Sequence, residues 1–314
     1  MDELTHWTDR ALYDSLVAAM VKRPRCMVVI ISNAGVGQGT SWQWAVREMA
    51  RHSSDWYFHR IDGPQASWIT ELNLQTVREA ITPAEYKRLW LNLWSKGGAT
   101  GLNMDDIERC IVLDDVTTRP LPDWNPVIAG LDLGIRHDHS ALCTLGINVG
   151  QQRFRLMNSV SWKPEQYGGE VQLEDVELEV LRTHRAYNLD VLFYDPHQAI
   201  SIVQRLTKYG IDCRPVEWTS HQKMRLMARR LVNAFRNRMI DLYRDDELIK
   251  DLARMSIEEK TQGMKLVGIR DEHGHCDRGF ALTIALTAGM DWAMSLHEAL
   301  VEGDDGEVAS ADFA

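Results

Sequence analysis

The chain has 314 residues, of which 45% are hydrophobic, and a formal net charge of −10. This length and apolar content suffice for one large or two modest domains with their own cores, and the acidic charge argues against general nucleic-acid affinity. The sequence has no apolar run of 18 residues and no signal-peptide pattern at its start, so we expect neither a transmembrane helix nor secretion. Its five cysteines show no CxxC spacing and are typical of reduced thiols in a cytosolic protein.

The first part of the chain predicts several helices around one strand. The apolar run Cys26–Ile31 predicts a buried strand. Thr82 and Pro83 are typical of a helix N-cap and first helical position. The predicted helices of this part cover residues 11–22, 42–50, 69–80 and 84–89.

Three glycines follow the predicted strand and resemble a phosphate loop only superficially. No Lys-Ser or Lys-Thr follows Gly35, Gly37 and Gly39, and the pattern G-x-x-x-x-G-K-[ST] occurs nowhere in the sequence. We therefore do not expect this chain to build a complete nucleotide site by itself.

A proline-rich segment, residues 117–126, predicts a linker. Its three prolines cannot continue a helix or a central strand. Beyond it, three meandering strands and then alternating strands and helices predict a mixed sheet with flanking helices. The predicted strands are 127–133, 141–147, 153–160, 191–194 and 213–216, and the predicted helices are 171–187, 199–209, 220–237 and about 278–296.

Three aspartates stand where predicted strands end or a helix begins. Asp132 and Asp195 each close an apolar strand, and Asp277 opens the last long helix. Carboxylates placed in this way can converge and bind Mg²⁺ or Mn²⁺, and two such ions about 4 Å apart drive phosphodiester cleavage. Gly130 and Gly134 flank Asp132, which favours a close approach to the backbone there.

Other interpretations of these residues remain open. Each aspartate taken alone can be structural, and Asp277 can simply cap its helix. His137, Asp138 and His139 pose a similar choice: Asp138 is a candidate auxiliary carboxylate, but a solvated loop is the simpler interpretation. His273, His275 and Cys276 resemble half of a zinc site but lack a second ligand cluster, so His275 can instead orient a water or a phosphate.

A basic stretch interrupts the acidic chain. Residues 201–240 contain nine Lys or Arg and two acids, a local sum of 9 − 2 = +7, whereas residues 295–314 carry six acids and no Lys or Arg. This pattern is compatible either with a grip on a phosphate backbone or with a solvated helix face. The candidate DNA contacts on the predicted helix 220–237 are Lys223, Arg225, Arg229 and Arg230.

The sequence resembles the carboxyl-terminal part of a phage terminase large subunit. The similar segments are Gly-Leu-Asp132-Leu-Gly, Tyr-Asp195-Pro and His275-Cys-Asp277-Arg-Gly-Phe-Ala-Leu, read along residues 127–296. The resemblance implies an RNase H-like nuclease that cuts double-stranded DNA during genome packaging, with Asp132, Asp195 and Asp277 holding two Mg²⁺ or Mn²⁺ ions. It also implies the host bacterial cytoplasm as location, portal protein and small terminase subunit as partners, and no membrane.

The beginning of the chain resembles the end of the family's ATPase domain. Asp2-Glu3 is similar to the close of a Walker B motif, residues 31–35 to the coupling motif, and residues 85–94 to the stretch that closes that domain. A Walker A segment is absent from the sequence, so ATP binding by this chain alone is not expected. The predicted organisation is an incomplete P-loop-type ATPase remnant over residues 1–116, a linker over 117–126, a nuclease domain over 127–300 and an acidic tail over 301–314.

Two alternative functions remain at this point. The same architecture serves recombination or junction-resolving nucleases, which a preference for branched DNA would indicate. The missing phosphate loop and the acidic charge also fit a non-catalytic packaging-motor fragment that docks onto a portal or a partner subunit.

Overall fold

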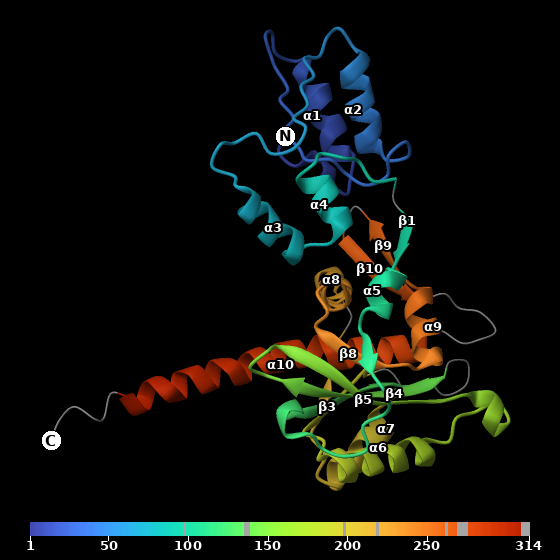
Figure 1. Cartoon of the computed structure of the whole chain (residues 1–314). Coiled ribbons are helices and arrows are strands. Elements are labelled where there is room, and N and C mark those ends of the chain that lie inside the picture. The colour runs from blue at the N-terminus through green and yellow to red at the C-terminus, as the bar shows by residue number, and fades with distance from the viewer. Residues whose placement is uncertain are drawn as a thin grey trace. The chain divides into compact units, whose positions relative to one another are not determined.

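The computed structural model describes residues 1–96, 98–134, 139–196, 199–217, 220–260, 263–268 and 276–308 (Figure 1). The chain forms two compact units: residues 1–100 with 257–265, and residues 101–256 with 266–314. Residues 101–116, placed before the linker in the predicted organisation, belong to the second unit because strand β2 (Ile111–Leu113) pairs with β8 (Ile240–Tyr243) of that unit.

The first unit is mainly helical. Thr82 accepts a hydrogen bond from the Glu85 amide while the Glu85 carboxylate accepts one from the Thr82 amide, so the predicted N-cap is confirmed as a capping box. The helices of this unit are η1 (Leu4–His6), α1 (Ala11–Met20), α2 (Trp42–His52), α3 (Glu71–Ala80) and α4 (Pro83–Leu89). A small sheet has the order β1-β9-β10, formed by Gly98–Gly101, Met255–Lys260 and Gly263–Gly268.

The predicted buried strand Cys26–Ile31 is wrong. Its residues are extended, but the only ladder contact found in the described part of the chain is an isolated parallel bridge between Asp2 and Ile31. Met27 is 79% exposed and Ile31 66% exposed. A strand needs a ladder of neighbours to bury its apolar side chains, and this segment has one short neighbour on one side.

The second unit contains a seven-stranded mixed sheet, which confirms the predicted architecture. Its strand order is β2-β8-β5-β4-β3-β6-β7. Strands β3, β4 and β5 form the predicted antiparallel meander, whereas β6 runs parallel to β3 and β7 parallel to β6. The remaining bounds are β3 Val127–Asp132, β4 Ser140–Asn148, β5 Arg153–Trp162, β6 Val191–Tyr194 and β7 Cys213–Pro215.

Helices cover both faces of this sheet (Figure 1). On one face, α6 (Leu173–Tyr187) and α7 (Ile200–Lys208) pack their buried side chains against Val127, Ala129 and Leu131 of β3. Helix α10 (Asp277–Val308) crosses the other face, with α8 and α9 against it. The shorter helices of this unit are η2 Pro122–Trp124, η3 Pro164–Tyr167, α5 Met104–Glu108, α8 His221–Arg236 and α9 Asp246–Arg254.

Helix α10 is the core helix of the sheet. Its segment Asp277–Leu296 is long and apolar enough to cross a membrane by length and composition alone, and 56% of that window is buried inside the protein. Its contacts with β3 and β4 account for the apolar composition, because a helix buried against a sheet needs the same residues.

Candidate functional site

Asp132 and Asp195 lie side by side at one edge of the sheet. Asp132 is the last residue of β3, and Asp195 follows β6 directly. The two strands are parallel with Leu131 opposite Tyr194, and the Asp195 amide donates to the Leu131 carbonyl at 3.3 Å. Neighbouring strands are about 4.8 Å apart, so this register brings the backbones of the two aspartates next to each other.

Helix α10 directs Asp277 toward the same edge. A Cβ atom on Gly130 would lie 2.2 Å from the Ala281 carbonyl oxygen, and one on Gly289 would lie 2.4 Å from Ile128. The helix therefore runs antiparallel to β3, with its beginning over the end of the strand. A helix rises about 1.5 Å and a strand about 3.3 Å per residue, which places the first turn of α10 near Asp132.

The close approach predicted at Gly130 is thus made by the helix of the same fold. No side chain fits between β3 and α10 at this point, because both nearest atoms, the Ala281 oxygen and the Ala285 nitrogen, belong to the helix backbone. Glycine in β3 fixes the depth at which the helix that carries Asp277 sits on the sheet.

His139 contacts the buried Asp277 from the neighbouring strand. It directly precedes β4, and its Nδ1 lies 3.7 Å from Asp277 Oδ2 while its Nε2 lies 3.8 Å from Glu165 Oε2. The His139 side chain is only 12% exposed. From the sequence, His139 was open between a role in the site and a place in a solvated loop, and its position just before a strand that pairs with Asp132 favours the site.

Arg278 anchors the start of α10 to the rest of the fold. Its guanidinium donates to Asp245 Oδ2 at 2.7 Å and to Glu247 Oε2 at 2.6 Å. It also donates to the Ser159 carbonyl oxygen and to the Ser161 hydroxyl of β5. These bonds hold Arg278, and with it the start of α10, in one orientation, because the planar guanidinium binds several acceptors at fixed angles.

Asp251 caps the same helix end. Its Oδ2 accepts from the Arg278 amide at 3.0 Å. Burial raises the pKa of the Asp251 carboxyl to about 6, and the nearby Asp277 charge adds to the increase. The first turn of α10 therefore lies among several carboxylates, of which Arg278 neutralises two.

The carboxylates of this region do not form a finished metal cage. Among the residues that the structure describes, no group of three or more His, Cys, Asp or Glu side chains is arranged to hold a metal ion. The donor set of Asp132, Asp195 and Asp277 still fits a hard divalent cation, because such ions prefer carboxylate oxygens. The candidates Asp138 and His275 lie outside the described residues.

The predicted basic helix forms, as α8, and two of its candidate DNA contacts are engaged within the protein. Arg230 forms a two-pronged ion pair with Asp291 of α10 and donates to the Thr287 carbonyl at 2.9 Å. Lys223, 54% exposed, pairs loosely with Glu217 at 3.3 Å. Arg225 and Arg229 are half-buried.

In the first unit, the structure brings the two predicted ATPase motifs together. Asp2 bridges to Ile31, and the Asn33 side chain donates to Glu3 Oε1 at 3.3 Å. The other carboxylate oxygen of Glu3 is buried without a hydrogen-bond partner among the described residues. A buried acceptor of this kind leaves room for a further donor.

Comparison with known proteins gives a consistent fold. No protein-family model and no curated protein matches the sequence. The structure is similar to the large terminase of a thermophilic bacteriophage (the thermophilic-phage terminase), with a TM-score of 0.61 and 14% identity over 90% of this chain and 67% of that one. The same protein in complex with ATP-gamma-S gives a TM-score of 0.62 at 12% identity over 90% of this chain and 69% of that one.

A weaker likeness, with a TM-score of 0.45 and 17% identity, relates 58% of the chain to 95% of the large terminase nuclease from phage G20c. The match to the thermophilic-phage terminase shows that the chain spans about two thirds of the length of that protein. The predicted architecture, a mixed sheet with flanking helices that follows part of an ATPase-type unit in the sequence, is confirmed at the level of fold. The chain has the fold of a bacteriophage large terminase.

Proposed function

We propose that this chain is a metal-dependent endonuclease that cuts double-stranded DNA during phage genome packaging. The observation that carries the proposal is the register of β3 and β6, which sets Asp132 and Asp195 side by side at the edge toward which α10 points Asp277. The fold shared with the thermophilic-phage terminase supports it.

In this proposal the three aspartates hold two Mg²⁺ or Mn²⁺ ions. Bound metal would activate water for attack on a DNA phosphorus and stabilise the leaving oxygen. Asp132 and Asp195 supply carboxylates from the rigid sheet, and Asp277 supplies one from the helix start. Arg278 and Asp251 fix that start, and His139 holds the Asp277 side chain from the other side.

We further propose that α8 faces the DNA. The candidate phosphate contacts on α8 are Lys223, Arg225, Arg229 and Arg230, of which Arg230 is bound to Asp291. Such contacts would give salt-dependent affinity with little sequence preference. By family resemblance, a portal protein and a small terminase subunit would be the partners of this chain. The thermophilic-phage terminase binds ATP-gamma-S, but we expect no ATPase activity from this chain alone, because its sequence has no Walker A pattern.

Nicking of supercoiled plasmid in Mn²⁺ tests the proposal. Asp195→Asn and Asp132→Asn should each reduce the nicking rate by at least about 10²-fold, since each removes one metal ligand while conserving side-chain volume. Asp212→Asn is the matched control, because Asp212 is a surface carboxylate between β6 and β7 paired with Arg214. Chelation by EDTA should abolish nicking. Cleavage that survives both site substitutions would refute the assignment.

A further inference from the structure

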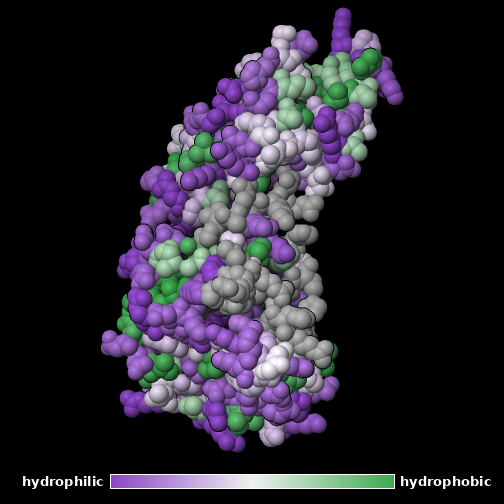
Figure 2. Space-filling view, turned by 90° about the vertical axis from the view of Figure 1, so that its right-hand side faces the viewer, coloured by the Kyte–Doolittle hydropathy of each residue, from purple (hydrophilic) through white to green (hydrophobic). Residues whose placement is uncertain are grey.

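Five strands of the second unit end at the same edge of its sheet (the carboxyl edge). Strands β3, β5, β6, β7 and β8 run in the same direction, and their last residues meet there. Helix α10 begins at this edge with Asp277. Figure 2 faces the side of the second unit at which α10 begins, and the lower part of that view is mostly hydrophilic surface. Polar side chains that follow these strands can therefore meet a substrate bound by the three aspartates.

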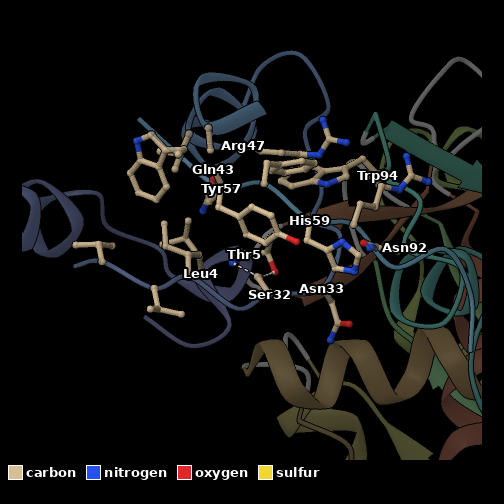
Figure 3. A pocket seen from close by; sticks show the side chains of 18 of the residues that line it. Leu4, Thr5, Ser32, Asn33, Gln43, Arg47, Tyr57, His59, Asn92 and Trp94 are labelled. Carbon is tan, nitrogen blue, oxygen red and sulfur yellow. Dashed lines mark hydrogen bonds between the residues drawn. The ribbon is translucent and has the colours of Figure 1, made fainter. Parts of the chain in front are cut away.

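A cavity of about 610 Å³ lies in the first unit and has no part in this edge (Figure 3). Its polar side chains Thr5 and Ser32 hydrogen-bond to each other, and Gln43 donates to the Trp7 carbonyl at 2.7 Å. All residues that line the cavity belong to the first unit. At the carboxyl edge, contact with DNA depends instead on exposed side chains.

Further acids at the carboxyl edge repel the phosphates of a substrate. Glu165 follows β5, and Asp245 and Glu247 follow β8. Because every DNA phosphate carries a negative charge, a base at this edge would offset the repulsion. Two bases are bound to Asp245 and Glu247, namely Arg278 and Lys163.

Arg278 is committed to the fold. Its side chain is only 15% exposed, and its guanidinium bonds to Asp245, Glu247 and the Ser159 carbonyl. If Arg278 turned toward a substrate, the buried Asp245 carboxylate would lose its ion pair, which is costly. Arg278 is therefore a structural base.

Lys163 can leave its partner at little cost. Its side chain is 37% exposed, and its Nζ donates to Glu247 Oε1 at 2.9 Å. The other oxygen of Glu247 keeps its bond from Arg278 at 2.6 Å, so Glu247 stays paired when Lys163 moves away. Exposed ion pairs of this kind add little to stability.

Lys163 and the start of α8 lie on opposite sides of the aspartates. The strand order β5-β4-β3-β6-β7 puts Asp132 and Asp195 between β5, which Lys163 follows, and β7. Lys223 of α8 pairs with Glu217 just beyond β7. Two strand spacings separate β5 from β3, about 10 Å in all. A phosphate backbone that crosses the aspartates would therefore meet one base on each side.

We propose that Lys163 releases Glu247 and binds a DNA phosphate next to the scissile phosphodiester. The inference rests on the proposed function and deepens it, because it names a substrate contact on the β5 side of the aspartates. Lysine suits this role, since its ammonium is a point charge with three donors on a flexible stem and needs no fixed phosphate orientation.

Acetylation of lysines tests the contact directly. The full-length chain is acetylated in EDTA with and without saturating duplex DNA, and mass spectrometry measures the modification rate at each lysine. Lys163 should react about tenfold more slowly with DNA, because its ammonium is then engaged by a phosphate. Lys208 is the internal control: it is exposed and ends α7, which leads back to the start of the parallel strand β7 at the opposite edge.

Salt dependence of DNA binding gives a second measure, also in EDTA. Lys163→Met should reduce the slope of log K against log salt by about 0.9, the value for one phosphate contact. Between about 50 and 200 mM salt, the unsubstituted chain should then lose about 3.5-fold more affinity than this variant. Lys163→Arg should keep the original slope because it keeps the charge, and Lys208→Met should keep it because the opposite edge does not meet DNA.

Three results would overturn the proposal. They are equal acetylation of Lys163 with and without DNA, an unchanged slope for Lys163→Met, and equal protection of Lys163 and Lys208, which would mean that DNA covers the surface without preference. The nuclease proposal is judged separately, by nicking in Mn²⁺. A chain that protects Lys163 but does not nick would refute the nuclease and keep the contact, and nicking without protection would do the reverse.

Discussion

Gly130→Ala should both destabilise the protein and slow its proposed nuclease reaction. The new Cβ would lie 2.2 Å from the Ala281 oxygen, whereas ordinary contacts begin at 3.4 Å, so α10 must retreat by about 3.4 − 2.2 = 1.2 Å. Overpacking of this kind costs about 1–3 kcal/mol, and the loss of glycine flexibility in a strand returns about 0.5–1 kcal/mol. We expect a net loss of about 2 kcal/mol, because the opposing atoms belong to the helix backbone and cannot rotate away.

The effect on activity follows from the same movement. Asp277 begins the displaced helix, and a misplacement of about 1 Å can cost about 10²-fold in rate. Urea unfolding followed by circular dichroism measures the stability, and nicking of supercoiled plasmid in Mn²⁺ measures the rate. Gly150→Ala is the matched control, since its nearest atom would be 3.8 Å away. If Gly130→Ala and Gly150→Ala have the same unfolding free energy and the same nicking rate, the contact between β3 and α10 does not set the position of Asp277.

Three further predictions concern charges around the same helix. Arg278→Ala should lower the free energy of unfolding by about 3–5 kcal/mol, because it leaves the buried Asp245 carboxylate unpaired, whereas the exposed Arg244→Ala should cost under about 1 kcal/mol in the same urea titration. Asp251→Asn should change the pH dependence of stability. The folded protein keeps a proton on Asp251 up to about pH 6, whereas the unfolded chain releases it near pH 3.8. The free energy of unfolding of the unsubstituted protein therefore falls by up to about 3 kcal/mol as pH rises from 3.8 to 6, and that of the Asp251→Asn variant does not. Urea unfolding in EDTA at pH 4 and pH 7 measures this difference. An equal change in unfolding free energy between the two pH values for both proteins would contradict the prediction. Lys223→Ala with Arg225→Ala should reduce the slope of log K against log salt for DNA binding by about 2, and an unchanged slope would mean that α8 does not face DNA.

The second unit could be predicted from the sequence because its strands carry local signals. The apolar runs that end at Asp132 and Asp195 form β3 and β6, and Asn188 and Gly210 end their helices in left-handed conformations as their residue types favour. Strand β8 was not predicted, because the charged Asp241 interrupts its four residues, which therefore lack the unbroken apolar run that indicated β6.

The first unit shows where local patterns fail. The run Cys26–Ile31 has the composition of a central strand, but strand formation depends on neighbours that composition does not describe. The candidate site also depends on contacts between residues that are far apart in the sequence. The contacts of Arg278 with Asp245 and Ser159 span 33 and 119 residues, so no pattern around Asp277 could indicate them.

The path of the chain between the two units has a consequence for dissecting the protein. The backbone passes from one unit to the other after Thr100, after Ser256 and after Lys265, because β9 lies between β1 and β10 in the small sheet. Neither unit is therefore one continuous piece of sequence. A shortened chain that begins at Gly101 would keep β9 and lose most of β1, and so would expose a new strand edge. Separating the second unit from the first therefore requires removal of residues 257–265 as well.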